Sequence, residues 1–442
     1  MAKRKVIIVG AAGRDFHNFN MLYRDRDDYD VIAFTATQIP DIDGRKYPAE
    51  LAGKNYPNGI PIVDEKELSS LIEKEKREEN PVDVVFSYSD ITHTRVMQVG
   101  SIALARGANF ILPSPTETMV ASSKPVVSIC AVRTGCGKSQ TTRAVSDCLT
   151  DMGKKAVAIR HPMPYGDLVK QKLQRYAETS DLKKYDCTIE EMEEYEPHID
   201  RGRVIYAGVD YEAITREAEK EADVIIWDGG NNDTSFLKSD LEIVVLDPHR
   251  TGHELTYHPG NTNFLRADLF VINKVDSADP KDVETLIDHC RQYNPDAAII
   301  KAESTLTVDN PELIKGKRVL VIEDGPTLTH GEMKIGAGTV AAERNGAAEL
   351  VDPRSIAVGT IKATYEKYPE IGILLPAMGY GEKQIRDLEA TINAADCDAV
   401  VIATPIDLNR IVRIDKPTTR VKYELDQQAV KKLDEILHKK FQ

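Results

Sequence analysis

The stretch Val126-Val-Ser-Ile-Cys-Ala-Val132-Arg133-Thr134-Gly135-Cys136-Gly137-Lys138-Ser139 decides the fold of this chain. Its first half is an apolar run of the kind that forms a strand buried in a parallel sheet. Its second half is a Gly-rich turn, and helix-forming residues follow from Gln140. A strand, a turn ending in Gly-Lys-Ser and a helix are the context of a phosphate-binding P-loop. The stretch therefore predicts a nucleotide-binding α/β domain.

The turn contains the residue types that phosphate binding needs. Glycines let backbone N–H groups converge on phosphate oxygens, and the helix N-terminus adds a positive field. Lys138 is expected to bridge the β- and γ-phosphates, and the Ser139 hydroxyl to ligate Mg²⁺. Val132 stands where the usual pattern has Gly, and Arg133 stands where a subclass of P-loop proteins carries an extra Lys. The residues predicted to contact the nucleotide here are Thr134, Gly135, Cys136, Gly137, Lys138, Ser139 and Gln140.

A second apolar strand ends in an acidic residue downstream of the P-loop. The segment is Val224-Ile-Ile-Trp-Asp228, followed by Gly-Gly-Asn-Asn-Asp233. A carboxylate at such a strand end holds Mg²⁺ or a water on it. We therefore predict Asp228 as the second Mg²⁺ ligand. Asp233 is either a water-positioning residue or an exposed loop acid.

The segment Asn273-Lys274-Val275-Asp276 follows a predicted strand at 268–272. It resembles the base-recognition element of GTPases, in which the Asp accepts hydrogen bonds from guanine and the Lys stem covers the base. ATP-using proteins of the same class also place an Asn here, so the sequence predicts ATP with GTP as an open alternative. Residues 302–304 are expected to form the other wall of the base pocket.

Two further segments concentrate His and Arg. They are Arg160–Asp167 and Asp247–Asn261, each after a predicted strand. Open α/β sheets bind ligands at the carboxyl ends of their strands. Arg binds phosphate bidentately and His moves protons or donates to oxyanions, so both segments suit a polyanionic substrate. The predicted catalytic residues are Lys138, Asp228, Arg133, His249 and Arg250, and the predicted substrate-binding residues are Arg160, His161, Tyr165, His253, His258 and Lys334.

Other interpretations of these residues stay open. A zinc site at His249, His253 and His258 competes with the substrate site, although Pro248 and Gly252 favour a loop over a metal-binding helix. Lys334 lies in a Gly-rich run over 324–338 that could wrap an anion or form a loop without a ligand.

The strand and helix pattern predicts three regions, a Rossmann-like parallel α/β domain at 1–124, a P-loop domain at 125–325 and a C-terminal α/β region at 326–442. In the first domain, Gly10–Asp15 resembles a dinucleotide-type turn. No acidic residue ends the second strand to hold a ribose, so NAD binding is the weaker interpretation. Alternatives are an anion site with Arg14, His17 and Asn18, or a scaffold role.

Composition limits the function classes. The chain has 442 residues and a formal net charge of −14, which disfavours nucleic acid or an anionic membrane as the main partner. No stretch approaches the roughly 18 apolar residues of a membrane span. Its six Cys show no paired C-x-x-C framework, which favours free thiols in a reducing cytoplasm.

The combination of motifs resembles the cyclic 2,3-diphosphoglycerate synthetase family. The resemblance rests on the P-loop with Arg133 before its glycines and on the segments 160–167, 228–233, 247–250 and 273–276. It covers most of residues 125–340 and implies a SIMIBI-class P-loop domain.

The resemblance implies ATP-driven closure of an intramolecular phosphoanhydride in 2,3-diphosphoglycerate, with ADP and phosphate released. It also implies Mg²⁺ and a homodimer. The alternatives are a regulatory or metallochaperone-like GTPase switch, favoured by the Asn273–Asp276 element, and a P-loop kinase or ligase acting on another phosphorylated small acid.

Overall fold

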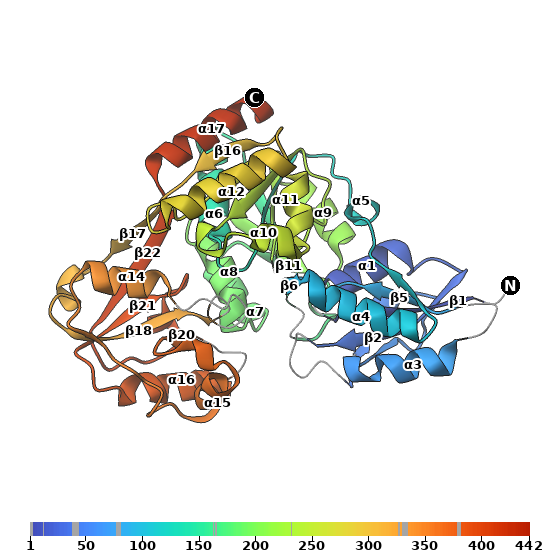
Figure 1. Cartoon of the computed structure of the whole chain (residues 1–442), viewed down its shortest axis with the longest axis horizontal. Helices are drawn as coiled ribbons and strands as arrows, with labels where there is room; N and C mark the ends of the chain where they lie inside the picture. Colours follow the sequence, from blue (N-terminus) through green and yellow to red (C-terminus); the bar gives the residue numbers. More distant parts are fainter. Residues whose placement is uncertain are drawn as a thin grey trace.

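The computed structural model shows an α/β protein built around three larger sheets (Figure 1). The predicted α/β class is confirmed. An eight-stranded sheet lies between an N-terminal and a C-terminal sheet of six strands each. The structure describes residues 3–11, 13–37, 44–76, 81–161, 163, 166–230, 232–325, 328, 335–377 and 382–442.

The central sheet contains the P-loop. Its strand order is β10-β11-β9-β12-β8-β13-β15-β16, and all neighbours are parallel except β10 with β11. Five of its strands, β8, β9, β11, β12 and β15, are buried on both faces, as the apolar runs require. The strands are β8 (Val126–Ala131), β9 (Ala156–Arg160), β10 (Leu173–Tyr176), β11 (Val204–Gly208), β12 (Val224–Asp228), β13 (Leu241–Leu246), β15 (Leu269–Ile272) and β16 (Ala298–Lys301).

The helices of this unit follow its strands in alternation. The P-loop joins β8 to α6, so the first turn of α6 lies at the carboxyl edge of the sheet. The helices and short turns are α6 (Lys138–Asp151), α7 (Thr179–Lys184), α8 (Ile189–Ile199), α9 (Tyr211–Glu219), η2 (Pro248–Arg250), α10 (His253–Thr256), α11 (Gly260–Arg266) and α12 (Pro280–Tyr293).

The charged sequence of the segment 165–200 predicts helices outside the sheet, and the structure differs in part. α7 and α8 are helices, but β10 adds to the sheet as an antiparallel edge strand. β10 alternates half-buried and buried residues, as an edge strand does. Because β10 has only four residues, the charged sequence on either side hides this alternation.

The N-terminal sheet has the order β3-β4-β2-β1-β5-β7 and is parallel except at β3. A two-stranded ribbon of β6 and β14 joins this unit to the central one. The elements are β1 (Arg4–Val9), α1 (Arg14–Leu22), β2 (Tyr29–Ala36), β3 (Lys46–Tyr47), α2 (Ala49–Ala52), β4 (Ile60–Asp64), η1 (Glu65–Glu67), α3 (Leu68–Glu75), β5 (Asp83–Phe86), β6 (Ile91–Thr92), α4 (His93–Ala105), β7 (Asn109–Ile111), α5 (Pro115–Thr118) and, in the central unit, β14 (Tyr257–His258).

The C-terminal sheet has the order β17-β22-β21-β18-β19, with β20 paired to β18. Its first strand begins at Ser304, ahead of the expected boundary at 326. Its elements are β17 (Ser304–Val308), η3 (Pro311–Leu313), β18 (Arg318–Asp324), α14 (Ala337–Arg344), β19 (Glu349–Leu350), α15 (Gly359–Lys367), η4 (Pro369–Ile371), β20 (Leu375–Ala377), α16 (Glu382–Ala394), β21 (Ala399–Ala403), η5 (Leu408–Arg410) and β22 (Thr418–Leu425).

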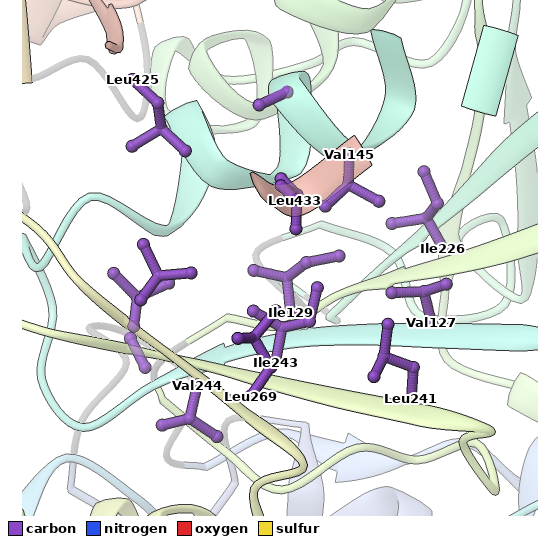
Figure 2. Close-up of a cluster of buried hydrophobic side chains, with 14 of the residues drawn as sticks. Val127, Ile129, Val145, Ile226, Leu241, Ile243, Val244, Leu269, Leu425 and Leu433 are labelled. Atoms are coloured by element: carbon purple, nitrogen blue, oxygen red, sulfur yellow. The ribbon is translucent and has the colours of Figure 1, made fainter. Parts of the chain in front are cut away.

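The last helix, α17 (Gln427–Phe441), leaves the C-terminal sheet and packs on α6 of the central unit. Leu425 and Leu433 belong to the same hydrophobic core as Val127, Ile129 and Ile243 of the central sheet (Figure 2). The end of the chain therefore closes the core beneath the P-loop helix. Within the described ranges, no helix combines the length and the apolar character that crossing a bilayer demands.

Candidate nucleotide and substrate site

The P-loop takes the conformation that its glycines allow. Gly135 and Gly137 have φ of 83° and 101°, which disfavours residues with a Cβ. A Cβ on Gly137 would lie 2.0 Å from Nδ2 of Asn273. The loop is therefore held against the strand end that carries Asn273.

The two residues predicted at the centre of the chemistry lie together. Nζ of Lys138 is 2.5 Å from Oδ1 of Asp228, and the Thr142 hydroxyl donates to the same oxygen at 3.0 Å. Burial of Asp228 opposes its ionisation, but the charges of Lys138 and Arg160 outweigh it and hold its pKa well below the usual value. The carboxylate is therefore ionised at neutral pH, as a metal ligand must be.

The residues around Asp228 fit a hard divalent cation. Ser139 is half-buried in the first turn of α6, next to Lys138. A hydroxyl and an ionised carboxylate are oxygen donors of the kind that Mg²⁺ prefers. The donor set of Ser139 and Asp228 thus suits Mg²⁺.

Arg160 lies beside Asp228 and uses its guanidinium on protein acceptors. It donates to the carbonyl oxygens of Asp228 and Gly229 at 3.2 and 2.8 Å, and it forms an ion pair with Glu194 of α8. Nε2 of His198 lies 3.6 Å from Oδ2 of Asp228. Arg160 therefore neutralises two carboxylates, and its predicted contact with substrate stays a prediction.

Arg133 is directed toward the N-terminal unit. Its Nε donates to Oδ1 of Asp90 at 2.7 Å, and its guanidinium lies 3.8 Å from the centre of the Tyr257 ring. The hydroxyl of Thr134 donates to the other oxygen of Asp90. The residue before the P-loop glycines thus links the loop to the first sheet, and its catalytic role is untested.

Three other predicted residues hold the P-loop backbone. Nη1 of Arg250 donates to the Thr134 carbonyl at 2.7 Å, Nζ of Lys274 to the Gly135 carbonyl at 2.6 Å and Nδ2 of Asn273 to the Cys136 carbonyl at 2.9 Å. Asp247 pairs with both Arg250 and Lys274. These contacts orient the loop so that its N–H groups are available to phosphate.

The predicted base-recognition element also contacts the C-terminal sheet. Oδ1 of Asp276 accepts from the N–H of Ser304 and Oδ2 accepts from Arg344, both at 3.1 Å. The Ser304 hydroxyl donates to Oε1 of Gln140 at 3.4 Å. Residues that follow β15 and β16 thus meet the first turn of α6 here, and their role in binding the base stays a prediction.

The three His residues of the second cluster make separate contacts. Nε2 of His249 lies 3.0 Å from the Ser277 hydroxyl, Nδ1 of His253 accepts from Arg133, and His258 pairs with Ile91 in the β14–β6 ribbon. Burial, helped by neighbouring arginines, lowers the pKa of His253 to about 4. Across the described residues, no group of three or more His, Cys, Asp or Glu could hold a metal ion.

A buried junction joins the start of α1 to the loop after β12. Nε of Arg14 lies 3.0 Å from Oδ1 of Asp233, and Nε2 of His161 lies 3.2 Å from Oδ2. His17 stacks on Phe236, with ring centres 4.0 Å apart. Asp233 is therefore a buried ion-pair partner rather than an exposed loop acid. Tyr165 and Lys334 lie outside the described residues.

Sequence reasoning missed Asp90, Glu194 and His198. Asp90 follows β5 and has φ of 58°, so a strand end followed by an acidic residue was the available signal. Glu194 and His198 lie on α8, whose run of glutamates resembles an ordinary solvated helix face. Only the fold brings that helix to Asp228.

The chain is 61% identical over 436 residues to a protein named arginine synthetase ArcE, from Thermococcus kodakarensis. The match covers 98% of this chain and 96% of that protein. No protein-family model matches the chain.

The solved structures that it resembles are much more distant. LpxK from Aquifex aeolicus, in complex with ATP, has a TM-score of 0.41 at 14% identity and covers 74% of this chain and 91% of its own. The hydrogenase maturation factor HypB from Archaeoglobus fulgidus has a TM-score of 0.26 at 19% identity and covers 48% of this chain and 89% of its own. Neither likeness is close enough to carry an argument about function.

The similarity to an arginine synthetase corrects one expectation from the sequence. The motifs led to cyclic 2,3-diphosphoglycerate synthesis, and that assignment is wrong. The motifs that suggested it belong to the nucleotide site and to the contacts that hold it, so they did not report on the second substrate.

Proposed function

Because the chain belongs to the family of the arginine synthetase ArcE, we propose that it is an ATP-dependent ligase that makes arginine. The identity of 61% over 98% of the chain carries the proposal. The pairing of Lys138 with Asp228 beside the P-loop supports it, since a synthetase must couple bond formation to nucleotide cleavage.

The chemistry of the product indicates the other substrates. The guanidinium group of arginine differs from a ureido group by a nitrogen in place of an oxygen. Transfer of the γ-phosphoryl group to a ureido oxygen would convert that oxygen into a phosphate leaving group, which ammonia could then displace. We therefore propose citrulline, ammonia and ATP as substrates, with arginine, ADP and phosphate as products.

The residues at the P-loop have separable tasks in this reaction. Backbone N–H groups of 135–138 and Nζ of Lys138 would bind the phosphates and stabilise the charge on the transferring group. Thr142 and Arg160 hold the carboxylate of Asp228 in place. Mg²⁺ on Ser139 and Asp228 would neutralise charge on the β- and γ-phosphates.

ATP is proposed over GTP because of the contacts of Asp276. In the GTPase element this carboxylate accepts hydrogen bonds from guanine. Here one oxygen accepts from the Ser304 N–H and the other from Arg344. Guanine recognition would have to displace Arg344, whereas adenine makes no such demand.

The test is arginine formation from citrulline, ammonium chloride and Mg·ATP, measured by amino-acid analysis together with phosphate release. We expect equal amounts of arginine and phosphate, and neither without citrulline or ammonium. Parallel reactions with GTP and with aspartate in place of ammonium define the nucleotide and the nitrogen donor. Phosphate release that ignores the amino acid, or no arginine with any donor, would contradict the proposal.

A further inference from the structure

Helix α8 brings an excess of carboxylates to the boundary with the C-terminal unit. Its sequence from 189 to 199 is IEEMEEYEPHI. Ile189 belongs to the hydrophobic core of the C-terminal unit, so the start of the helix packs there. Burying charged side chains in such a position costs free energy unless they have ion-pair or hydrogen-bond partners.

Most of these glutamates have identified partners that explain them. Glu191 closes a capping box with Thr188. Glu194 pairs with the buried Arg160, and Glu196 pairs with Arg410 of the C-terminal unit.

Glu193 is different. It is 5% exposed, and its Oε1 is buried without a hydrogen-bond partner among the described residues. Its carboxyl group lies near that of Asp324 at the end of β18. Burial raises the pKa of Glu193 well above its usual value, and the charges of Asp324, Glu190 and Glu194 add to the effect.

Glu323, the neighbour of Asp324, shows what a satisfied carboxylate looks like in the same place. Its Oε1 accepts from the N–H of Thr339 at 2.9 Å and from the Thr339 hydroxyl at 3.2 Å. It thereby binds the start of α14. No comparable structural task is visible for the unpartnered oxygen of Glu193 within the described part of the chain.

The cluster lies close to the reaction centre. Glu194, the next residue on α8, pairs with Arg160, and Arg160 contacts Asp228. The helix that carries Glu193 is therefore linked to the Mg²⁺-binding carboxylate through Glu194 and Arg160.

We propose that Glu193 and Asp324, with Glu190 and Glu194 around them, bind the cationic nitrogen group of the reaction. This group is either the ammonium ion that supplies nitrogen or the guanidinium of arginine. The inference rests on the proposed function, and it assigns the cation subsite to the boundary between the central and C-terminal units.

The chemistry of the two carboxyl groups fits such a ligand. A nitrogen cation supplies N–H donors to the oxygen of Glu193 that lacks one, and its positive charge offsets the charges of the neighbouring carboxyl groups. Charge-assisted hydrogen bonds of this kind are stronger than neutral ones.

The test uses Glu193→Gln and Asp324→Asn, with Glu212→Gln on the exposed start of α9 as the matched control. Arginine binding to the nucleotide-free full chain is measured by calorimetry, and the KM for ammonium is measured in the complete reaction. We expect each cluster variant to weaken one of these constants by roughly ten- to a hundredfold. The dissociation constant of Mg·ATP should change less than about twofold in every variant.

The outcomes separate this inference from the proposed function. Weaker arginine binding identifies a guanidinium subsite, and a raised KM for ammonium alone identifies the nitrogen-donor site. Unchanged values for both constants in either folded variant overturn the inference even if the wild type makes arginine. If the wild type makes no arginine, calorimetry with arginine and with guanidinium chloride still tests whether the site binds a nitrogen cation. Absence of binding to the wild type overturns the cation site.

Discussion

The central unit meets its two neighbours through boundaries of opposite electrostatic character. The N-terminal boundary joins Arg14, Asp90, Arg133, His161 and Asp233, in which each acidic side chain faces a cation or a hydrogen-bond donor. The C-terminal boundary gathers Glu190, Glu193, Glu194 and Asp324, and of these Glu194 pairs with Arg160.

This difference in charge distinguishes a boundary with a structural role from a boundary that binds a ligand. A boundary whose charges cancel needs no ligand and holds the two units together. At the other boundary the buried Oε1 of Glu193 has no hydrogen-bond donor among the described residues, which costs free energy that a cationic ligand would recover. We therefore assign the N-terminal boundary to scaffolding of the P-loop and the C-terminal boundary to substrate.

The largest effect is expected at the P-loop, which both boundaries serve. Lys138→Ala should reduce nucleotide turnover about ten-thousandfold, within the range for removing a cation from a phosphoryl-transfer site. Lys238→Ala, at an exposed lysine, is the control. Phosphate release measures the effect, and thermal unfolding verifies the fold. Retained turnover would mean that Lys138 is not needed at the nucleotide site, and the P-loop would then no longer link the two boundaries to the reaction.

Breaking the charge-matched boundary should mainly affect stability. Asp233→Asn leaves Arg14 buried without its counter-charge, and such a change costs about 4 kcal/mol of unfolding free energy. Denaturant unfolding followed by tryptophan fluorescence suits the measurement, because the single Trp, Trp227, lies next to Phe236 in this region. A variant as stable as the wild type would show that the boundary is not held by this pair.

The same kind of substitution at the other boundary should have the opposite sign. Burial raises the pKa of Glu193, so the folded chain disfavours the charged form of this side chain. Glu193→Gln removes the ionisable group, and we expect the free energy of unfolding at pH 7 to rise. A loss comparable to that of Asp233→Asn would mean that the two boundaries do not differ.

The sequence predicted the central α/β fold and the nucleotide site, because both depend on local patterns. Apolar runs, glycines at fixed spacing and the acid at 228 are read directly from neighbouring residues. The second substrate was not predictable in this way. Arg133 and Arg250 looked like phosphate ligands, but the fold directs them to Asp90 and to the P-loop backbone.

The carboxylate cluster was hidden for the same physical reason. Glu193 and Asp324 are more than a hundred residues apart in the chain, and a glutamate-rich helix is ordinarily solvated. Only the packing of α8 against the C-terminal unit reveals that the buried Glu193 lies near the half-buried Asp324.

The smallest predicted effect concerns pH and the N-terminal boundary. Burial and the charge of Arg14 lower the pKa of His17 to about 3, from an ordinary value of about 6.5. Between these values the unfolded chain binds a proton that the folded chain does not, so stability falls as pH drops below about 6.5. From pH 6.5 to 5, His17 should account for about 2 kcal/mol of lost stability. Denaturant unfolding of the wild type and of His17→Gln at both pH values isolates this contribution, because Gln can still donate to the Thr118 carbonyl but does not titrate. Equal pH dependence in the two proteins would mean that His17 does not contribute to the acid sensitivity of this boundary.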